Sequence, residues 1–287
     1  MDSLKKSRKH QQQNNEETPT RSLLRYFGGK WAIAPWVMQH LPPHRIYVEP
    51  FGGAASILLR KPRSKIEVYN DLDEEIVGIF RVVQDPVMCR MLMKRLRRTP
   101  YSRREFELAF QSSADPVIRA QRAITRAYQA FHHEALFNLN KVTFADARHR
   151  TGGHSKAHEW MSYPRNLAAV CQRLQGVIIE CRNAVEIIRV QDTPDTLFFV
   201  DPPYMPSTRS KTGYRCELDE QGHRELLATL CGVKGMVVLA GYPSALYDDE
   251  LDGWQRVERP HYAAGSAKVR TEVLWISPKA VKRAKKS

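Results

Sequence analysis

Short apolar runs alternate along the chain with segments whose apolar residues recur at helical spacing. The runs are rich in Val, Ile and Phe, and they are predicted to be core strands at 46–48, 66–69, 177–179, 197–200 and 236–239. Helices are expected between them at 74–83, 184–189 and 219–230. This alternation predicts an α/β fold in which a mostly parallel sheet carries helices on both faces. Segments 254–259 and 272–276 are expected to form an antiparallel pair at one edge of the sheet.

The block from residue 86 to residue 175 breaks the alternation of strands and helices. Its pattern predicts helices at 87–98, 103–110 and 117–131, followed by irregular chain around 151–154. A strand-poor insertion of this length within an α/β sheet is most simply a separate lobe. We therefore expect 86–175 to form a helical lobe of its own.

The distribution of charge along the chain indicates a class of partner for that lobe. The chain has 45 Lys and Arg against 31 Asp and Glu, a formal net charge of +14. Residues 89–176 alone carry 16 Lys and Arg against 6 Asp and Glu. A basic protein of this size favours polyanions, nucleic acid above all. A solvated basic face is the ordinary alternative, but the concentration in one block favours a module that contacts DNA.

The ends of the chain and the cysteines narrow the class of protein further. Residues 1–20 are rich in Lys, Gln, Asn and Glu and are expected to be a disordered leader, and 279–287 a basic tail. No apolar run approaches the ~18 residues of a membrane span, and no secretory signal is recognisable. The five cysteines show neither a CxxC pair nor metal-ligand spacing. We expect a cytoplasmic protein with reduced thiols, no metal site and no membrane partner.

The most informative stretch is Asp201-Pro202-Pro203-Tyr204, directly after the predicted strand 197–200. Two prolines cannot continue a central strand, because they donate no backbone hydrogen. The chain must leave the sheet at its carboxyl edge, where open α/β sheets bind ligands. A carboxylate and backbone carbonyls there can accept hydrogen bonds from an amino group while the ring stacks on a flat base. The alternative is an Asp-Pro turn with a packing tyrosine.

Two further segments carry residues suited to ligand binding. The first predicted strand ends in Glu-Pro-Phe-Gly-Gly at 49–53, before an apolar run that is expected to be helical, and glycines there let a ligand approach the backbone. Asp71 follows Gly53 by 18 residues, close to the spacing at which an acid holds a nucleoside ribose. The loop lacks the GxGxxG pattern of a dinucleotide enzyme. Upstream, a Gly-Gly turn within 26–30 could present Tyr26 and Lys30 to a ligand, although an ordinary turn is the alternative.

Together these segments resemble the Dam-type DNA adenine methyltransferases. The resemblance covers nearly the whole chain after the leader, and its motifs occur in the order that the family uses: Tyr26-Phe27-Gly28-Gly29-Lys30, Glu49-Pro50-Phe51-Gly52-Gly53, Asn70-Asp71, Asp201-Pro202-Pro203-Tyr204 and Arg270-Thr271-Glu272-Val273-Leu274-Trp275. It implies a seven-stranded methyltransferase sheet formed by 21–85 and 176–278, with a DNA-recognition lobe inserted at 86–175. An alternative role for Arg270 and Glu272 is a structural ion pair outside the site.

The resemblance implies that the cofactor is S-adenosylmethionine. The positions that match the family's cofactor contacts are Tyr26, Lys30, Phe51, Gly52, Gly53, Asp71, Asn183 and Asp201. Two positions depart from the family's pattern. Ala55 stands where many members have glycine, so its methyl group would narrow the loop. Asn183 stands where relatives commonly carry an aspartate that meets the cofactor's adenine, and its amide oxygen is expected to make a weaker contact.

The resemblance also implies the catalytic segment, Asp201, Pro202, Pro203 and Tyr204, and double-stranded DNA as the partner. A base inside a duplex must be flipped out before its amino group can react. Asp201 and a carbonyl near Pro202 would accept the amino hydrogens of adenine, and Tyr204 would stack on the ring. Arg209 is a candidate DNA contact, and a surface arginine is the alternative. Neither a metal nor a covalent enzyme intermediate is needed.

Two other functions remain open at this level. A cytosine N4 methyltransferase solves the same chemical problem, but that group usually carries serine in place of Asp201. A DNA-binding regulator with a decayed active site is the other alternative, and the intact Asp201 and Asp71 argue against it. A monomer is favoured, and a cognate restriction enzyme is a possible partner in a bacterial nucleoid or a phage-infected cell. The residues that read the DNA sequence are not identified.

Overall fold

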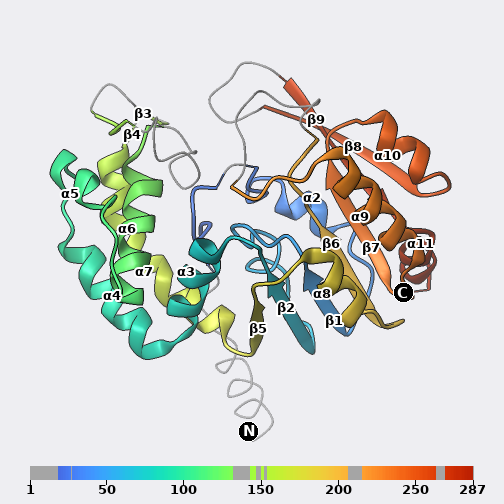
Figure 1. Ribbon diagram of the computed structural model, residues 1–287, viewed down its shortest axis with the longest axis horizontal. Coiled ribbons are helices and arrows are strands. Elements are labelled where there is room, and N and C mark those ends of the chain that lie inside the picture. Colours follow the sequence, from blue (N-terminus) through green and yellow to red (C-terminus); the bar gives the residue numbers. More distant parts are fainter. Residues whose placement is uncertain are drawn as a thin grey trace, which may run out of the picture.

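The computed structural model describes residues 19–26, 28–131, 143–146, 150–151, 154–205, 215–262 and 269–286. Its main feature is a seven-stranded sheet, with helices against it and beside it (Figure 1). In spatial order the strands are β5 (Val177–Glu180), β2 (Ile66–Asn70), β1 (Ile46–Glu49), β6 (Thr196–Val200), β7 (Met236–Gly241), β9 (Val269–Ile276) and β8 (Gln255–Tyr262). All seven predicted strands are present. Most of the expected leader and all of Arg209 lie outside the described residues.

The directions of the strands create a ligand-binding edge. Strands β5, β2, β1, β6 and β7 are parallel, whereas β9 is antiparallel to both β7 and β8. From β1 the chain builds outward through β2 to β5, and from β6 it builds the other way to β7. The order therefore reverses between β1 and β6, which places a crevice outside their carboxyl ends. The predicted fold class, α/β with a mostly parallel seven-stranded sheet, is confirmed.

Alternate side chains of the strands enter two separate hydrophobic cores. In β6, Leu197 and Phe199 point to one core, and Phe198 and Val200 to the other. The second core is covered by α8 (Ala184–Val190), α9 (Glu220–Gly232) and α10 (Ala245–Glu250). The first is covered by α2 (Ala34–Met38), α3 (Glu74–Gln84) and α11 (Pro278–Ala284), among others. Burial on both faces explains why the strand sequences read as continuous apolar runs.

Aspartate caps begin several helices at the positions that the sequence pattern predicts. Asp73 accepts a hydrogen bond from the Glu75 backbone N–H and begins α3. Asp85 and Asp115 cap α4 (Pro86–Arg98) and α6 (Pro116–Gln129). In both helices a proline follows the cap, at a position where its missing N–H costs nothing.

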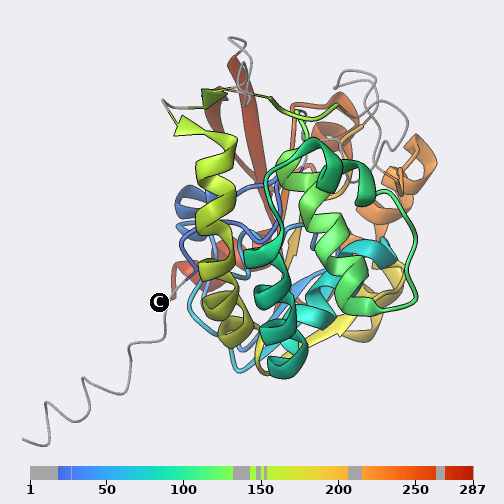
Figure 2. The ribbon, with the colours of Figure 1, turned by 90° about the vertical axis from the view of Figure 1, so that its left-hand side faces the viewer.

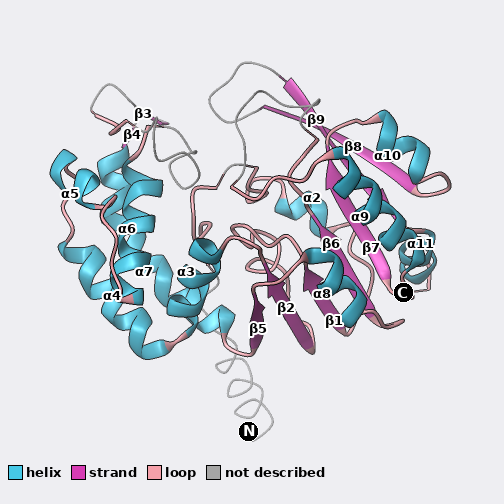
Figure 3. Ribbon diagram, viewed as in Figure 1, coloured by secondary structure: helices cyan, strands magenta, loops and turns pink. Residues whose placement is uncertain are grey.

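Helices α4, α5 (Arg103–Leu108), α6 and α7 (Lys156–Leu174) lie between β2 and β5 in the chain and form a group at one side of the sheet (Figure 3). Helices α4, α6 and α7 pack on one another and on α3 (Figure 2). A short two-stranded sheet of β3 (Arg150–Thr151) and β4 (His154–Ser155) precedes α7, where irregular chain was expected.

Helix α7 has no counterpart among the predicted helices. It contains Pro164, which removes a backbone donor and normally interrupts a helix. The helix nevertheless buries Trp160, Tyr163, Leu167 and Val170 at spacings of three and four residues. Tertiary packing of this stripe thus overrides the local signal of the proline.

One other expectation about local structure was wrong. The apolar run after Ser56 was expected to be helical but forms only hydrogen-bonded turns, because the Glu49 carboxylate takes the Leu58 backbone N–H at 2.8 Å. Ala55, with a φ of 52°, also interrupts helical geometry. Within the expected basic tail, 279–287, the chain continues helix α11 (Pro278–Ala284), and Arg283 pairs with Asp195 at 2.7 Å.

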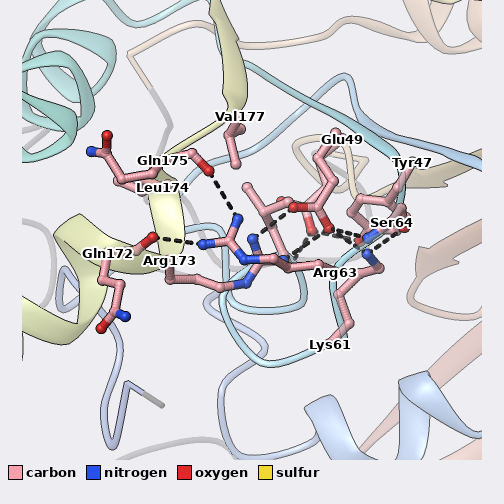
Figure 4. Close-up of polar contacts among 12 residues, drawn as sticks. Tyr47, Glu49, Lys61, Arg63, Ser64, Gln172, Arg173, Leu174, Gln175 and Val177 are labelled. Atoms are coloured by element: carbon pink, nitrogen blue, oxygen red, sulfur yellow. Dashed lines mark hydrogen bonds and ion pairs between the residues drawn. The ribbon is translucent and has the colours of Figure 1, made fainter. Parts of the chain in front are cut away.

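A buried ionic cluster ties the end of α7 to the sheet. Arg173 donates two hydrogen bonds to Glu67 of β2, at 2.6 and 2.9 Å, and Lys61 bonds the same carboxylate at 2.6 Å. All three residues are buried. Figure 4 shows Arg63 beside them, donating to the carbonyls of Gln172 and Gln175 at the end of α7. The helical group is therefore attached to the sheet by charge-assisted hydrogen bonds as well as by apolar packing.

Among the described residues, no helix is both long enough and apolar enough to cross a membrane.

Candidate active site

A cavity opens at the carboxyl edge of the sheet, at the reversal of strand order between β1 and β6. The loops that follow β1, β2, β5 and β6 line it, and the start of α9 bounds it. Nine of the predicted site residues are brought together in its wall: Tyr26, Lys30, Phe51, Gly52, Gly53, Asp71, Asn183, Asp201 and Pro203. Pro202 and Tyr204 are buried directly beside them.

The loop after β1 is shaped by two glycines that have no room for a side chain. A Cβ atom on Gly52 would lie 2.1 Å from the ring of Tyr69, and one on Gly53 would lie 2.9 Å from the ring of Tyr26. Gly53 also has a φ of 47°, in the region that favours glycine. Tyr69 in turn donates a hydrogen bond to the Gly53 carbonyl at 2.8 Å. The loop is thus held between two aromatic rings, with its backbone facing the cavity.

Asp71 joins this loop to the end of β2. One of its carboxylate oxygens accepts the Gly53 backbone N–H at 2.8 Å, and the other accepts the Asp73 N–H at 2.9 Å. Burial raises the pKa of the Asp71 carboxyl, and the two backbone hydrogen bonds act in the opposite direction. Each carboxylate oxygen has a second lone pair, so Asp71 can still accept from a ligand hydroxyl.

Asp201 and Lys30 form the charged centre of the site. Lys30 reaches Asp201 from the amino-terminal segment, with 3.0 Å between its Nζ and Oδ2, and donates to the Gly28 carbonyl at 2.9 Å. Burial raises the pKa of the Asp201 carboxyl to about 6, while Lys30 opposes the shift. Asp201 is therefore ionised at neutral pH, but it is more basic than an exposed carboxylate.

Glu272, which lies in one of the motifs that carry the family resemblance but was not among the predicted site residues, belongs to the same cluster. Its Oε1 lies 3.4 Å from Lys30 Nζ and accepts a hydrogen bond from the Tyr204 hydroxyl. The alternative of a structural pair with Arg270 is wrong, since Arg270 donates to the Tyr242 hydroxyl at 3.1 Å. Glu272 reaches the site because β9 runs antiparallel, so its first half lies at the carboxyl edge of β7.

The Tyr204 ring is enclosed in this state. Lys30 Nζ lies 4.8 Å from its centroid, and the Tyr242 ring meets it edge-on at a centroid distance of 4.4 Å. The side chain therefore presents little surface to solvent, with 6% exposed. A base can stack on this ring only after one of its faces has been uncovered.

The two departures from the family's pattern have definite structural roles. Ala55 is the one non-glycine residue with a positive φ among the described residues, and it is fully buried. Asn183 caps α8 by accepting the Val185 backbone N–H at 2.8 Å. The cap occupies one lone pair of the amide oxygen, so a ligand would share that oxygen with the helix terminus.

Two other residues of the site were not among the predicted site residues, although Glu49 lies in one of the motifs that carry the family resemblance. Buried Glu49 faces the cavity, and its Oε1 accepts from the Tyr47 hydroxyl at 2.6 Å. Burial raises the pKa of the Glu49 carboxyl to about 7. Arg215 also lines the cavity and pairs with Asp73 and Glu75, each at 3.0 Å. A buried acid after a strand and an arginine beyond a long loop resemble many structural residues, so only the three-dimensional fold identifies them.

Comparison with known proteins agrees with this geometry. Residues 26–245 match the family described as D12 class N6 adenine-specific DNA methyltransferase. The DNA adenine methylase of Salmonella typhi is 22% identical over 256 residues, which cover 84% of this chain and 86% of the relative. Its namesake from Escherichia coli K12 is 24% identical over 218 residues, 71% of this chain and 73% of the relative. The DNA adenine methylase of Vibrio cholerae serotype O1 is 24% identical over 203 residues, which cover 68% of this chain and 69% of the relative. Because the family match spans most of the chain, the protein belongs to the D12 class of N6 adenine-specific DNA methyltransferases.

Proposed function

We propose that this chain methylates the N6 amino group of an adenine that is flipped out of double-stranded DNA, with S-adenosylmethionine as the donor. The observation that carries the proposal is the Asp201-Pro202-Pro203-Tyr204 segment, which follows β6 directly and borders the cavity at the switch point of the sheet. An amino group delivered to this edge meets a carboxylate, backbone carbonyls and an aromatic ring within four consecutive residues.

The residues that line the cavity fit the proposed cofactor. A nucleoside ribose needs an acceptor near the end of β2, and Asp71 retains free lone pairs there. Gly52 and Gly53 line the cavity, so the loop backbone borders the space in which the cofactor would bind. Asp201 and Glu49 supply the carboxylates that a cationic ligand needs nearby. When bound, S-adenosylmethionine supplies a methyl group on a positively charged sulfonium.

In the proposed reaction, residues of the chain activate the adenine amino nitrogen, which is a poor nucleophile on its own. The lone pair of an adenine amino nitrogen is delocalised into the ring. Asp201 and the Pro202 carbonyl accept the two amino hydrogens, which favours a pyramidal nitrogen with a localised lone pair. Tyr204 stacks on the base and fixes its plane. The rate enhancement then comes mainly from orientation and from acceptors that are already in place.

The helical group between β2 and β5 is the proposed DNA-recognition lobe, residues 86–175. It holds most of the chain's surplus of basic residues, and basic residues provide affinity for the phosphate backbone. Arg209, which lies outside the described residues, stays a predicted DNA contact. We further propose that the protein acts as a monomer in the cytoplasm, where bacterial or phage DNA is available, with a cognate restriction enzyme as a possible partner.

A methyl-transfer assay with radiolabelled cofactor and adenine-containing duplex DNA tests the proposal. The Asp201→Ala variant should lose at least about 100-fold in rate, because an essential acceptor is removed. Asp252→Ala is the matched control, since Asp252 is exposed and lies away from the cavity. Equal rates for the wild type and Asp201→Ala would contradict the proposed mechanism.

Two measurements separate the remaining alternatives. Nucleoside analysis of the product distinguishes N6-methyladenine from N4-methylcytosine. Calorimetry of cofactor binding tests the decayed regulator, which would bind DNA tightly and bind the cofactor undetectably.

A further inference from the structure

The proposed mechanism leaves one buried carboxylate at the site unexplained. Glu272 has a side chain that is only 3% exposed, and it does not line the cavity. Its carboxylate is instead directed at Lys30 and at the Tyr204 hydroxyl. An isolated buried charge is costly, so its interactions with Lys30 and Tyr204 must compensate for its lost hydration.

The geometry connects Glu272 to Asp201 through two shared partners. Lys30 Nζ lies 3.0 Å from Asp201 Oδ2 and 3.4 Å from Glu272 Oε1, so one ammonium serves two carboxylates. The Tyr204 hydroxyl donates to Glu272, which fixes the ring that follows the catalytic prolines. Removing Glu272 would leave the whole Lys30 charge to Asp201 and release the Tyr204 ring.

We infer that Glu272 is a positioning residue for the proposed reaction. Its carboxylate competes with Asp201 for the Lys30 ammonium, and it accepts the hydrogen bond that fixes the orientation of the Tyr204 ring before the target base binds. The inference rests on the proposed function, and it assigns Glu272 a role that acts through Lys30 and Tyr204. Without Glu272, Lys30 binds the lone pairs that Asp201 needs for the amino group of adenine, and the base meets a ring with no fixed orientation.

The acid–base behaviour of Asp201 provides a readout that a purely structural role would not change. Burial raises the pKa of the Asp201 carboxyl, Lys30 lowers it, Glu272 raises it and Tyr204 lowers it. Glu49 and Tyr247 also face Asp201 from the end of β1 and from α10, and they remain in place in the variants below. Neutralising Glu272 should therefore lower the pKa of Asp201, whereas removing the Tyr204 hydroxyl should raise it.

The test compares Glu272→Gln, Tyr204→Phe and the wild type in full-length protein, with long unmethylated duplex DNA and labelled S-adenosylmethionine. For Glu272→Gln we expect kcat to fall about tenfold, as for one weakened charge-assisted hydrogen bond. The acid limb of its kcat/KM profile should move to lower pH, and that of Tyr204→Phe to higher pH. Affinity for the cofactor should stay within about twofold, because Glu272 is outside the cavity.

Glu258→Gln is the matched control. Glu258 lies on the neighbouring strand β8, is exposed and pairs with Arg256, so both kcat and the acid limb should equal those of the wild type. Thermal unfolding reports whether each variant is folded. If Glu272→Gln does not fold, Glu272→Asp replaces it: the charge is kept but the side chain is shorter, so kcat should fall without a downward shift of the limb.

A folded Glu272→Gln variant with wild-type kcat and an unmoved acid limb would overturn the inference. The inference would also be overturned if the acid limb of the kcat/KM profile moved in the same direction in Glu272→Gln and Tyr204→Phe. A wild-type kcat in Glu272→Asp would overturn it too. These outcomes can be distinguished from those expected if the proposed function itself is wrong. In that case the wild type would form no N6-methyladenine, or Asp201→Ala would be as active as the wild type.

Discussion

At the scale of single residues, the account depends on the protonation state of Asp201. Burial raises the pKa of its carboxyl, and the Lys30 ammonium, 3.0 Å away, lowers it. A carboxylate accepts at both oxygens, whereas a carboxylic acid has lost part of that capacity and donates instead. The proposed mechanism therefore requires Asp201 to be ionised.

Activity should decline as the pH falls through the pKa of Asp201, about 6. Above that value the ionised form dominates and kcat/KM is at its plateau. Below it, kcat/KM should drop by about tenfold for each pH unit. A pH–rate profile of the wild type checks this, with Asp201→Asn as the variant that cannot titrate at this position. A wild-type profile that stays level through pH 6 would be inconsistent with the assignment.

Gly52 provides the sharpest steric prediction. Gly52→Ala should destabilise the protein by about 2 kcal/mol or more, because the new methyl overlaps the buried Tyr69 ring. Cofactor affinity should fall with it, since the loop that lines the cavity must shift. The control is Gly78→Ala in α3, where nothing lies within 4 Å of an added Cβ. That change should stabilise the protein by roughly 0.5–1 kcal/mol through helix propensity. Urea unfolding and cofactor calorimetry measure both effects, and equal stability of the two variants would refute the steric argument.

At the scale of secondary-structure elements, the local signals in the sequence were sufficient for most of the fold. Apolar runs predicted all seven strands of the main sheet, and the helical spacing of apolar residues predicted helices at the places of α4 and α6. Helix α7 was missed because packing of its buried stripe outweighs Pro164. The helix expected after Ser56 was wrong because the carboxylate of Glu49, nine residues before Leu58, takes the Leu58 backbone donor.

In the candidate site, residues next to predicted strand ends could be placed from the sequence, whereas a residue brought there by strand pairing could not. Motifs next to strand ends, such as Asp71 and Asp201, could be placed because the carboxyl ends of parallel strands meet at one edge. Glu272 could not be placed in this way. It lies 71 positions after Asp201, and only the antiparallel pairing of β9 with β7 brings it to that edge.

The ionic cluster that joins α7 to β2 should be essential for stability. Glu67→Ala leaves Lys61 and Arg173 buried without their carboxylate, which should cost about 3–5 kcal/mol. Arg104→Ala is the control. The Arg104 side chain is 77% exposed, and its pair with Glu107 is long at 4.0 Å, so the loss in free energy of unfolding should stay below ~0.5 kcal/mol. Chemical denaturation measures both values. A small loss for Glu67→Ala would show that the cluster does not anchor the helical group.

At the scale of the whole molecule, the cavity and the basic block of the sequence belong to different parts of the chain. The cavity lies at the carboxyl edge of the sheet, and helices α4, α6 and α7 lie beside the sheet (Figure 1). Residues 89–176, which include most of α4 and all of α6 and α7, carry 16 Lys and Arg against 6 Asp and Glu. This arrangement suits a substrate that is a long polyanion with one reactive base. Affinity for DNA should then depend on the helical group, and turnover on the sheet edge.

Exposed arginines of α4 test this separation. The double variant Arg97→Ala/Arg98→Ala should weaken DNA binding and reduce the slope of log K against log salt by up to about 2, as two phosphate contacts are lost. Cofactor affinity should not change. The control removes the same charge elsewhere, from exposed Lys285 and Lys286 beyond α11. Equal loss of DNA affinity in both double variants would show that net charge matters and the helical group does not.

The most direct test of the central claim is a crystal structure of the protein with duplex DNA and a non-reactive analogue of the cofactor. We predict an adenine turned out of the duplex, with its N6 within hydrogen-bond distance of Asp201 and of the Pro202 carbonyl and its ring against Tyr204. An extruded base bound elsewhere, with Asp201 still paired to Lys30 and remote from the amino group, would contradict the account.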